Sequence, residues 1–446
     1  MKSKSLEKNG MTRREFLWLT SMSAAGFVIG CTTDPVTGKK QFTLVSENQE
    51  IQLDKQNSPH QFSSDYGVLQ DTSLNNYIGG LGKRLASHTH RPDMPYSFQG
   101  VNATYVNAYA FPGGSIAATR GILLQLSNEA ELAGLLGHEL GHVNARHTAE
   151  QMTKGTLISG LIGLGQAYVG TKYPKYADMT QTLGTLGVGA LLASYSRDNE
   201  READALGNEY MVRGGYNPMG FIGLMNMLKN MSNHKSNAVE MLFSTHPMSS
   251  ERYNTAVESA KTKYKSEQTL PTNRERYMDN TAKLRAIKGA IEEMQKGESA
   301  MAQKQYPTAE AHFQRALKES PNDYAGLLLM SKCQLMQKKN TQAQHYAEKA
   351  KQVYPREAQA YHLSGVAKVN TNKFGAAYEE FGKYDRLLPG NPNTAFYKGL
   401  SLEGMGRKQQ AADEYKKYLQ VTQQSPQAKH AYQRLLKWGY IKQRKN

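Results

Sequence analysis

Cysteine is scarce in this sequence, which contains two cysteines among 446 residues. Cys31 and Cys333 do not make a disulfide framework of the kind that stabilises small secreted domains, so each needs its own explanation. The chain also lacks the apolar runs of about 20 residues that transmembrane helices need. This absence argues against an integral membrane protein, and the length favours two soluble domains.

Acidic residues are outnumbered, because 39 Asp and Glu stand against 55 Lys and Arg, a formal net charge of +16. Residues 1–30 carry +3 from five basic and two acidic side chains, so the remainder carries about +13 (16 − 3). A basic surface suits nucleic acid, anionic lipid or acidic protein. No nucleic-acid-binding motif is present, so we expect no nucleic-acid partner and attribute the charge to a membrane surface or to solubility.

The first 30 residues are typical of an export signal. A basic start precedes an apolar stretch over residues 16–30, which is too short to span a bilayer. The pair Arg13-Arg14 resembles a twin-arginine signal, which favours twin-arginine export. Trp18 stands where such signals often carry Lys, so the Sec route stays open.

The end of this segment resembles a lipobox. Val28-Ile29-Gly30 precedes Cys31, which would become the lipidated first residue of the mature protein. We therefore expect a periplasmic, membrane-anchored lipoprotein. Thr32 in place of Asp favours the outer membrane. The alternative is that Cys31 is an ordinary thiol after a signal anchor.

A 34-residue period begins near residue 290. Its landmarks are the small residues Ala309, Ala343, Ala377 and Ala411, the prolines Pro321, Pro355 and Pro389, the glycines Gly297, Gly365 and Gly399 with Ser331 at the gap, and the aromatics Phe313, Phe381 and Tyr415 with Ala347 at the missing place. This matches the tetratricopeptide pattern, in which small residues let paired helices approach and proline ends the second helix. The alternative is a generic helical bundle.

Four repeats fit this spacing, and residues 427–437 are predicted to form a capping helix. Cys333 falls in the first helix of the second repeat, where we expect a buried and inert side chain. Such arrays bind peptides or protein segments rather than catalyse reactions. The C-terminal part is therefore predicted to recruit protein partners.

His138-Glu139-Leu140-Gly141-His142 is an H-E-x-x-H motif. Residues 127–136 before it predict an amphipathic helix, on which His138 and His142 project from one face as two ligands of a single Zn²⁺. Glu139 points to the side, where it can act as the general base toward a water molecule that the metal makes more acidic.

A catalytic zinc site needs a third protein ligand. Glu200 and Asp204 are four residues apart and share a face of a second predicted helix. Glu200 is the predicted third ligand, and Asp204 can orient a ligand histidine through its free ring nitrogen. The alternative is a solvated charged helix, and for Glu202 we expect only that.

These motifs resemble the HtpX/CAAX-prenyl-protease family of gluzincin peptidases, which also has an Asn-Ala-Tyr-Ala-Phe-Pro-Gly-Gly segment like residues 107–114 and a later His-Pro like His246-Pro247. With the lipobox, the Asp-Pro-Val-Thr-Gly of residues 34–38 and the repeats, the chain resembles the periplasmic subgroup of β-barrel assembly-enhancing proteases. The resemblance implies one zinc per chain, endopeptidase activity on misassembled envelope proteins, and docking of the repeats on outer-membrane assembly machinery.

His246 lies 46 residues after Glu200 (246 − 200), far enough for a loop to return to the site. Pro247 favours an extended backbone at His246. Its imidazole could occupy the fourth zinc position and keep the enzyme latent, or donate a hydrogen bond to the developing oxyanion. The alternative is a surface histidine before a turn. Arg252 is a further candidate oxyanion or substrate-carboxylate partner.

Two other segments bear on the cleft. Residues 101–121 alternate enough to predict a strand near the site, which could pair with extended substrate or be purely structural. The glycine-rich segments 156–170 and 182–193 could touch membrane or cover the cleft, although a buried helical hairpin is favoured.

We therefore expect an export signal in residues 1–30 and a mostly helical α+β, zincin-like metalloprotease domain with a small sheet in residues 31–270. A linker over residues 271–289 leads to an all-α repeat domain over residues 290–446. The alternative function is a chaperone-like assembly adaptor with a latent or structural zinc site, although an intact Glu139 argues against it.

Overall fold

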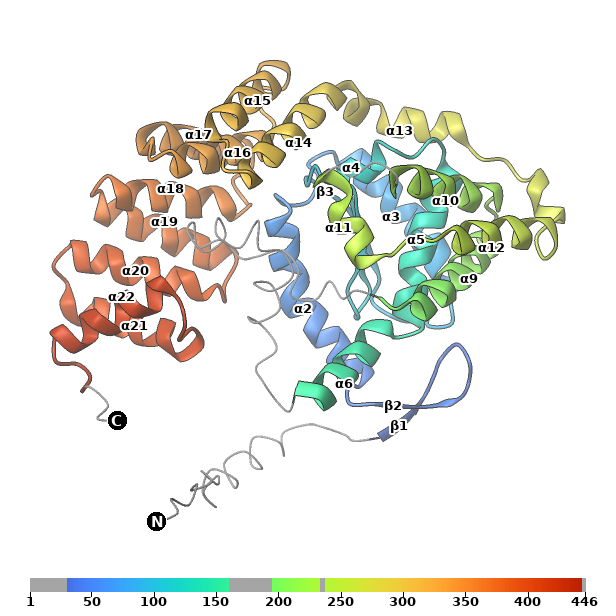
Figure 1. Ribbon diagram of the computed structural model, residues 1–446, viewed down its shortest axis with the longest axis horizontal. Helices are drawn as coiled ribbons and strands as arrows, with labels where there is room; N and C mark the ends of the chain where they lie inside the picture. The colour runs from blue at the N-terminus through green and yellow to red at the C-terminus, as the bar shows by residue number, and fades with distance from the viewer. Residues whose placement is uncertain (1–29, 160–194, 233–236, 443–446) are drawn as a thin grey trace, which may run out of the picture.

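The computed structural model describes residues 30–159, 195–232 and 237–442. An N-terminal domain of helices around a small sheet precedes a curved array of paired helices (Figure 1). This architecture confirms the predicted fold class of an α+β domain followed by an all-α repeat solenoid.

The elements of the N-terminal domain are β1 (Gly30–Thr33), β2 (Lys40–Thr43), α2 (Glu47–Ser64), α3 (Thr72–Ala86), β3 (Ser97–Val101), β4 (Ala108–Ala110), β5 (Ser115–Thr119), α4 (Arg120–Leu123), α5 (Glu129–Asn144), α6 (His147–Ser159), α9 (Arg197–Arg213), α10 (Met219–Ser232), α11 (Asn237–Thr245), α12 (Ser250–Lys261), η1 (Ser266–Thr269) and α13 (Arg274–Ala286). Over the ranges that the structure describes, no helix combines the length and apolar character that crossing a bilayer requires. The predicted export signal before residue 30 and most of the two glycine-rich segments lie outside those ranges.

The sheet has three strands in the order β3-β5-β4, with β3 parallel and β4 antiparallel to β5. The strand predicted within residues 101–121 is present near α5 as two strands, β4 and β5, because Pro112, Gly113 and Gly114 reverse the chain between them. Gly114 has a φ of +102°, which glycine adopts without steric cost. Within the described sheet, β4 is an edge strand that pairs with β5 alone.

Helix α5 runs through the centre of the N-terminal domain, and all its residues are buried. The predicted amphipathic character is therefore wrong, because α3, α9, α10, α13 and the sheet pack around this helix. Glycines allow α9 to approach α5 closely. A Cβ atom added at Gly137 would lie 2.6 Å from the carbonyl oxygen of Gly207, and one at Gly141 would lie 2.7 Å from that of Ala203.

The repeat domain contains α14 (Lys288–Ala302), α15 (Tyr306–Glu319), α16 (Tyr324–Met336), α17 (Asn340–Val353), α18 (Gln359–Asn370), α19 (Phe374–Leu387), α20 (Pro392–Gly404), α21 (Lys408–Val421) and α22 (Pro426–Lys437). Pairs of successive helices from α14 to α21 form four repeats, and α22 packs on α21 at the open end. Burial of the Cys333 thiol raises its pKa to about 11, as expected for an inert side chain.

The glycine and aromatic landmarks of the repeats fit together sterically. A Cβ atom added at Gly297 would lie 2.3 Å from the ring of Phe313, and one at Gly399 would lie 2.7 Å from that of Tyr415. In the second repeat the aromatic position is alanine. Ser331 occupies the place where the other repeats have glycine, and its hydroxyl donates a hydrogen bond to the carbonyl of Ala343 at 2.8 Å.

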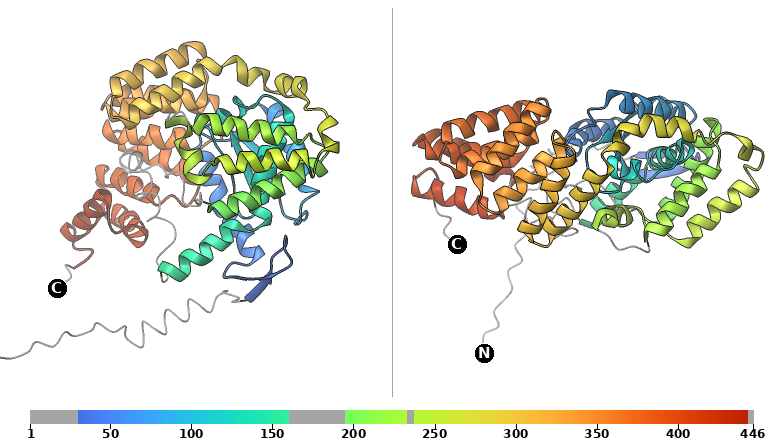
Figure 2. Two further views of the ribbon diagram at one scale, coloured as in Figure 1. Left: turned by 45° about the vertical axis from the view of Figure 1, so that its right-hand side comes forward. Right: turned by 90° about the horizontal axis from the view of Figure 1, so that it is seen from above.

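The repeat domain lies next to the N-terminal domain near the sheet (Figures 1 and 2), and polar side chains of the two domains pair across their interface. Glu298 of α14 accepts hydrogen bonds from Tyr66, at 3.1 Å, and from Thr104. Arg120, directly after β5, pairs with Asp323 at the start of α16. Most of the expected linker, residues 271–289, is helix α13, which packs against α3 and α5.

Candidate active site

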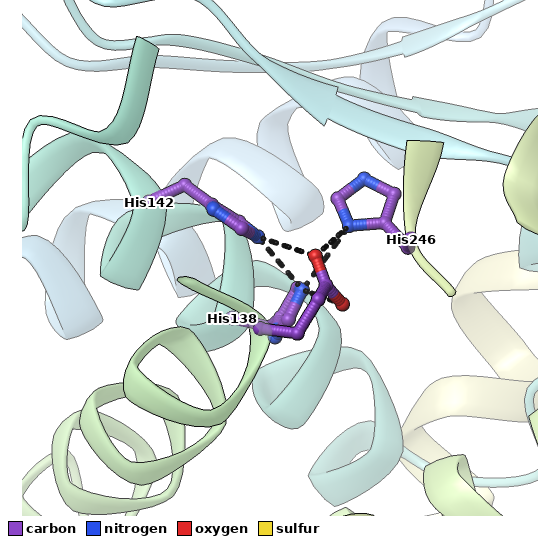
Figure 3. Close-up of side chains that lie close together, drawn as sticks. His138, His142 and His246 are labelled. Atoms are coloured by element: carbon purple, nitrogen blue, oxygen red, sulfur yellow. Dashed lines mark hydrogen bonds and ion pairs between the residues drawn. The ribbon is translucent and has the colours of Figure 1, made fainter. Parts of the chain in front are cut away.

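Helix α5 presents His138 and His142 on one face, as the four-residue spacing predicts. Their Nε2 atoms lie 3.0 Å apart, and both rings are buried (Figure 3). Asn128 begins the helix, because its side chain accepts a hydrogen bond from the backbone N–H of Glu131.

Helix α9 supplies Glu200 from its first turn. Ser196 and Asn199 cap the start of this helix through reciprocal hydrogen bonds between side chain and backbone. Oε1 of Glu200 lies 3.3 Å from Nε2 of His142, and Oε2 lies 3.7 Å from Nε2 of His138. The structure therefore brings Glu200 together with both histidines of α5.

His246 follows directly after α11 and turns its ring into the same cluster (Figure 3). Its Nδ1 atom lies 3.3 Å from Nε2 of His138 and 3.1 Å from Oε1 of Glu200. The ring is 5% exposed, so His246 is not a surface histidine before a turn.

The four side chains His138, His142, Glu200 and His246 fit a metal ion. Each offers one donor atom, and these atoms lie within 4.8 Å of one another. Ligands about 2.0–2.1 Å from a tetrahedral ion are roughly 3.3 Å apart, and most of the separations between these donors are 3.0–3.3 Å. Three imidazole rings and a carboxylate converge on one buried point, an arrangement that a shared cation would satisfy. The set suits a divalent metal, for which zinc is the usual choice.

Glu139 lies beside this cluster and is 1% exposed. Its Oε1 atom lies 3.9 Å from Nε2 of His246, and its Oε2 atom has no hydrogen-bond partner among the described residues. Burial raises the pKa of Glu139, although His246 and His138 oppose the shift. A buried carboxylate with a raised pKa is a stronger proton acceptor than an exposed one.

Asp204 and Arg252 contact the candidate metal ligands from outside the cluster. Oδ1 of Asp204 lies 2.9 Å from Nδ1 of His138, the orienting position expected for Asp204. Arg252 donates to both oxygens of Asp204 at 2.6 Å, and its Nη1 lies 2.5 Å from Oε2 of Glu200. The guanidinium group therefore pairs with Asp204 and Glu200. A residue that binds the oxyanion or a substrate carboxylate, as expected of Arg252, would instead point its guanidinium toward the substrate.

The charged groups of the site shift one another's pKa values. Burial alone would raise the pKa of Glu200, but His246 and Arg252 hold it well below its usual value. Burial would lower the pKa of His246, but Glu200 and Glu139 raise it. Burial lowers the pKa of His142 and favours the neutral imidazole that a metal ion requires.

Sequence reasoning missed two residues of the site. Tyr195 stacks on His142 with ring centroids 3.7 Å apart, a contact for which the sequence holds no signal. His147 lies with Nδ1 2.9 Å from Nδ1 of His142, and the five-residue spacing from His142 could have drawn attention to it. The expectation that Glu202 is merely solvated was wrong, because its Oε2 atom lies 3.2 Å from Nε2 of His147.

Two segments of the chain match known protein families. Residues 72–260 match the profile of peptidase family M48, and residues 300–366 match that of the tetratricopeptide repeat. The chain is 29% identical over 233 residues to the Beta-barrel assembly-enhancing protease of Escherichia coli (strain K12), a match that covers 51% of this chain and 47% of that protein. It is 32% identical over 192 residues to the protein of the same name from Yersinia pestis, covering 42% and 39%.

A third relative is Metalloprotease YcaL of Escherichia coli (strain K12), 27% identical over 201 residues, which cover 45% of this chain and 72% of that protein. The matches to the two assembly-enhancing proteases span less than half of their length.

Proposed function

We propose that this chain, in which a peptidase family M48 domain precedes tetratricopeptide repeats, is a zinc-dependent endopeptidase of the cell envelope. One observation carries the proposal: a buried set of histidine and glutamate donors lies beside Glu139, whose second oxygen is unpartnered among the described residues. A structural metal site needs no such base.

His138, His142 and Glu200 would hold the metal. A zinc ion bound there would polarise the scissile carbonyl and acidify the attacking water. Glu139 would take the proton of that water and later transfer it to the leaving amine. Asp204 would orient His138, and we assign Arg252 to holding Asp204 and Glu200 in place rather than to contacting substrate.

His246 would act as a latch. Its Nδ1 atom is part of the donor set, so it would occupy the position that a catalytic site leaves open for water and substrate. The alternative, a hydrogen bond from His246 to the oxyanion, requires the ring to lie beside that position instead. The observed contacts with His138 and Glu200 favour the latch.

Strand β4 is the proposed docking edge for extended substrate. It lies against α5 and pairs with β5 alone among the described strands, so we place the added substrate strand on its other edge. A purely structural strand remains the alternative.

We further propose that the chain is exported, that Cys31 carries a lipid anchor in the outer membrane, and that the substrates are misassembled outer-membrane or periplasmic proteins. The lipobox pattern supports the anchor, and the names of the relatives support the substrate class. The repeats would recruit partners of the assembly machinery, since arrays of this kind bind protein segments.

Cleavage of an unfolded polypeptide by the purified, zinc-loaded chain tests the enzymatic proposal. We expect cleavage by the wild type or by His246→Ala, loss of cleavage on zinc chelation with recovery on zinc addition, and no cleavage by Glu139→Gln that still binds zinc. Cleavage would be followed by mass spectrometry of the fragments. An assembly adaptor would bind the polypeptide, but neither the wild type nor His246→Ala would cleave it.

A further inference from the structure

We propose that His147 and Glu202 form a positioning relay, which fixes the tautomer and orientation of His142 and thereby sets the affinity of the site for its metal. The inference rests on the proposed function in one respect only, that His142 is a metal ligand.

The three side chains form a line that leads away from the donor set. Nε2 of His142 faces the other donors, and Nδ1 on the opposite side of the ring lies 2.9 Å from Nδ1 of His147. Nε2 of His147 in turn lies 3.2 Å from Oε2 of Glu202. Nδ1 of His142 and both ring nitrogens of His147 therefore each have one defined neighbour.

These contacts allow a single arrangement of protons. A metal at Nε2 of His142 leaves the proton of that neutral ring on Nδ1, which must donate to an acceptor. Nδ1 of His147 can accept only if His147 carries its own proton on Nε2. The Glu202 carboxylate accepts that proton and so selects the required tautomer of His147.

The backbone conformation before His147 directs its side chain toward His142. Arg146 has a φ of +57°, which is uncommon for a residue other than glycine and reverses the chain between α5 and α6. Its side chain donates to both carboxylate oxygens of the buried Glu50, at 3.1 and 3.2 Å, and to the carbonyl of Val45. These bonds anchor the strained residue, and His147, the next residue, is held against His142.

The two histidines of α5 thus have different supports. His138 contacts the carboxylate of Asp204 directly, and Arg252 holds that carboxylate from behind. His142 contacts a neutral ring, and its carboxylate lies one ring further out, with 37% of the Glu202 side chain exposed. The support of His142 therefore depends on a chain of two hydrogen bonds, which substitutions can break one at a time.

Three substitutions at His147 separate hydrogen bonding from packing. In His147→Asn the amide oxygen can take the place of Nδ1 and accept from His142. In His147→Gln the amide lies near the Nε2 position, and in His147→Phe both hydrogen bonds are lost while the ring remains. Zinc affinity of the full chain would be measured by competition with a chelator, and the absorption spectrum of the Co²⁺-loaded chain would report ligand geometry.

We expect the Phe and Gln variants to bind zinc about 10–100-fold more weakly than the wild type and to alter the Co²⁺ spectrum. His147→Asn should stay within about threefold of the wild type. Glu202→Ala should weaken zinc binding by a smaller factor, and it provides the test if the His147 variants do not fold. Asp198→Ala removes the same charge from an exposed position on α9 and should change nothing.

Unchanged zinc affinity and an unchanged Co²⁺ spectrum in both His147→Phe and Glu202→Ala would overturn the relay. Equal losses in His147→Asn and His147→Phe would also overturn it, because packing rather than the accepted hydrogen bond would then matter. If the wild type and His246→Ala both bind zinc but neither cleaves the polypeptide, the proposed function is contradicted and the relay stays intact.

Discussion

Arg120 and Asp323 form a bidentate ion pair between the two domains. Nη1 of Arg120 lies 2.6 Å from Oδ2 of Asp323, and Nη2 lies 3.1 Å from Oδ1, with both side chains at most 5% exposed. Arg120 directly follows β5, while the Asp323 side chain also caps α16 through the backbone N–H of Gly326. The repeats therefore support the sheet of the N-terminal domain.

Replacing Arg120 by Met should destabilise the chain by about 3–5 kcal/mol, because Asp323 would remain buried without its cationic partner. The free energy of unfolding in urea measures the effect. Arg201→Met is the matched control, because Arg201 pairs with Glu251 at the exposed surface and its loss should leave stability unchanged. Equal stability of the two variants would contradict the structural role of the Arg120–Asp323 pair.

The interface should also respond to pH through Asp65, which accepts hydrogen bonds from Tyr105 and Tyr109. Burial raises the pKa of Asp65 from 3.8 to about 6, although these hydrogen bonds oppose the shift. The folded chain therefore holds this proton more tightly than the unfolded chain. The resulting stabilisation is complete below about pH 4 and is lost as the pH rises through about 6. At about 1.4 kcal/mol per pH unit, the loss amounts to roughly 3 kcal/mol.

Asp65→Asn should remove that dependence, so its stability relative to the wild type should increase between pH 4 and pH 7. Urea unfolding across this range makes the comparison. A difference between the two proteins that stays constant with pH would show that Asp65 does not titrate with the raised pKa.

His246→Ala should cleave an unfolded polypeptide faster than the wild type, because removal of the latch opens the fourth position of the site. Initial rates on zinc-loaded protein provide the measurement, with exposed His88→Ala as the control. A rate about a hundredfold lower would instead assign His246 to oxyanion stabilisation, and an unchanged rate would place it outside the mechanism.

Glu200→Gln should weaken zinc binding, since a neutral amide replaces the anionic oxygen of the third ligand. Glu139→Gln should leave zinc bound. Metal content after challenge with a chelator distinguishes the two variants, and Glu209→Gln on the same helix serves as the control. Full retention of zinc by Glu200→Gln would mean that another residue supplies the third ligand.

Cys31→Ala should prevent lipid attachment and release the chain from the membrane fraction or leave an uncleaved precursor. Fractionation followed by intact-mass measurement distinguishes these forms. A fully processed variant that stays in the membrane fraction would refute the lipoprotein proposal.

Local spacing explains why part of this protein could be predicted. Two histidines four residues apart must share a face of a helix, and a 34-residue period must bring equivalent residues to equivalent places in a stack. In the second repeat, Ser331 and Ala347 depart from the pattern together. Without a large ring at the aromatic position, the neighbouring helix has no need of glycine.

Predictions failed where a long-range contact decided the outcome. Arg252 had the right charge to bind an oxyanion. The direction of its side chain, however, is set by ion pairs from α12 to Asp204 and Glu200 on α9. The relay through His147 depended on the left-handed backbone of Arg146, which buried Glu50 holds. Neither the direction of the Arg252 side chain nor the position of His147 follows from the spacing of nearby residues.

The sequence by itself determined the helical repeats, the two histidines and Glu139 on one helix, and the shared face of Glu200 and Asp204 on another. These features depend on periodicity within single elements. Only the tertiary structure decided that His246 closes the donor set, that Tyr195 covers His142, and that the repeats support the sheet. These relationships depend on how closely packed elements approach one another. Here that approach is set by glycines such as Gly137 and Gly207, where the absence of a side chain lets two helices meet.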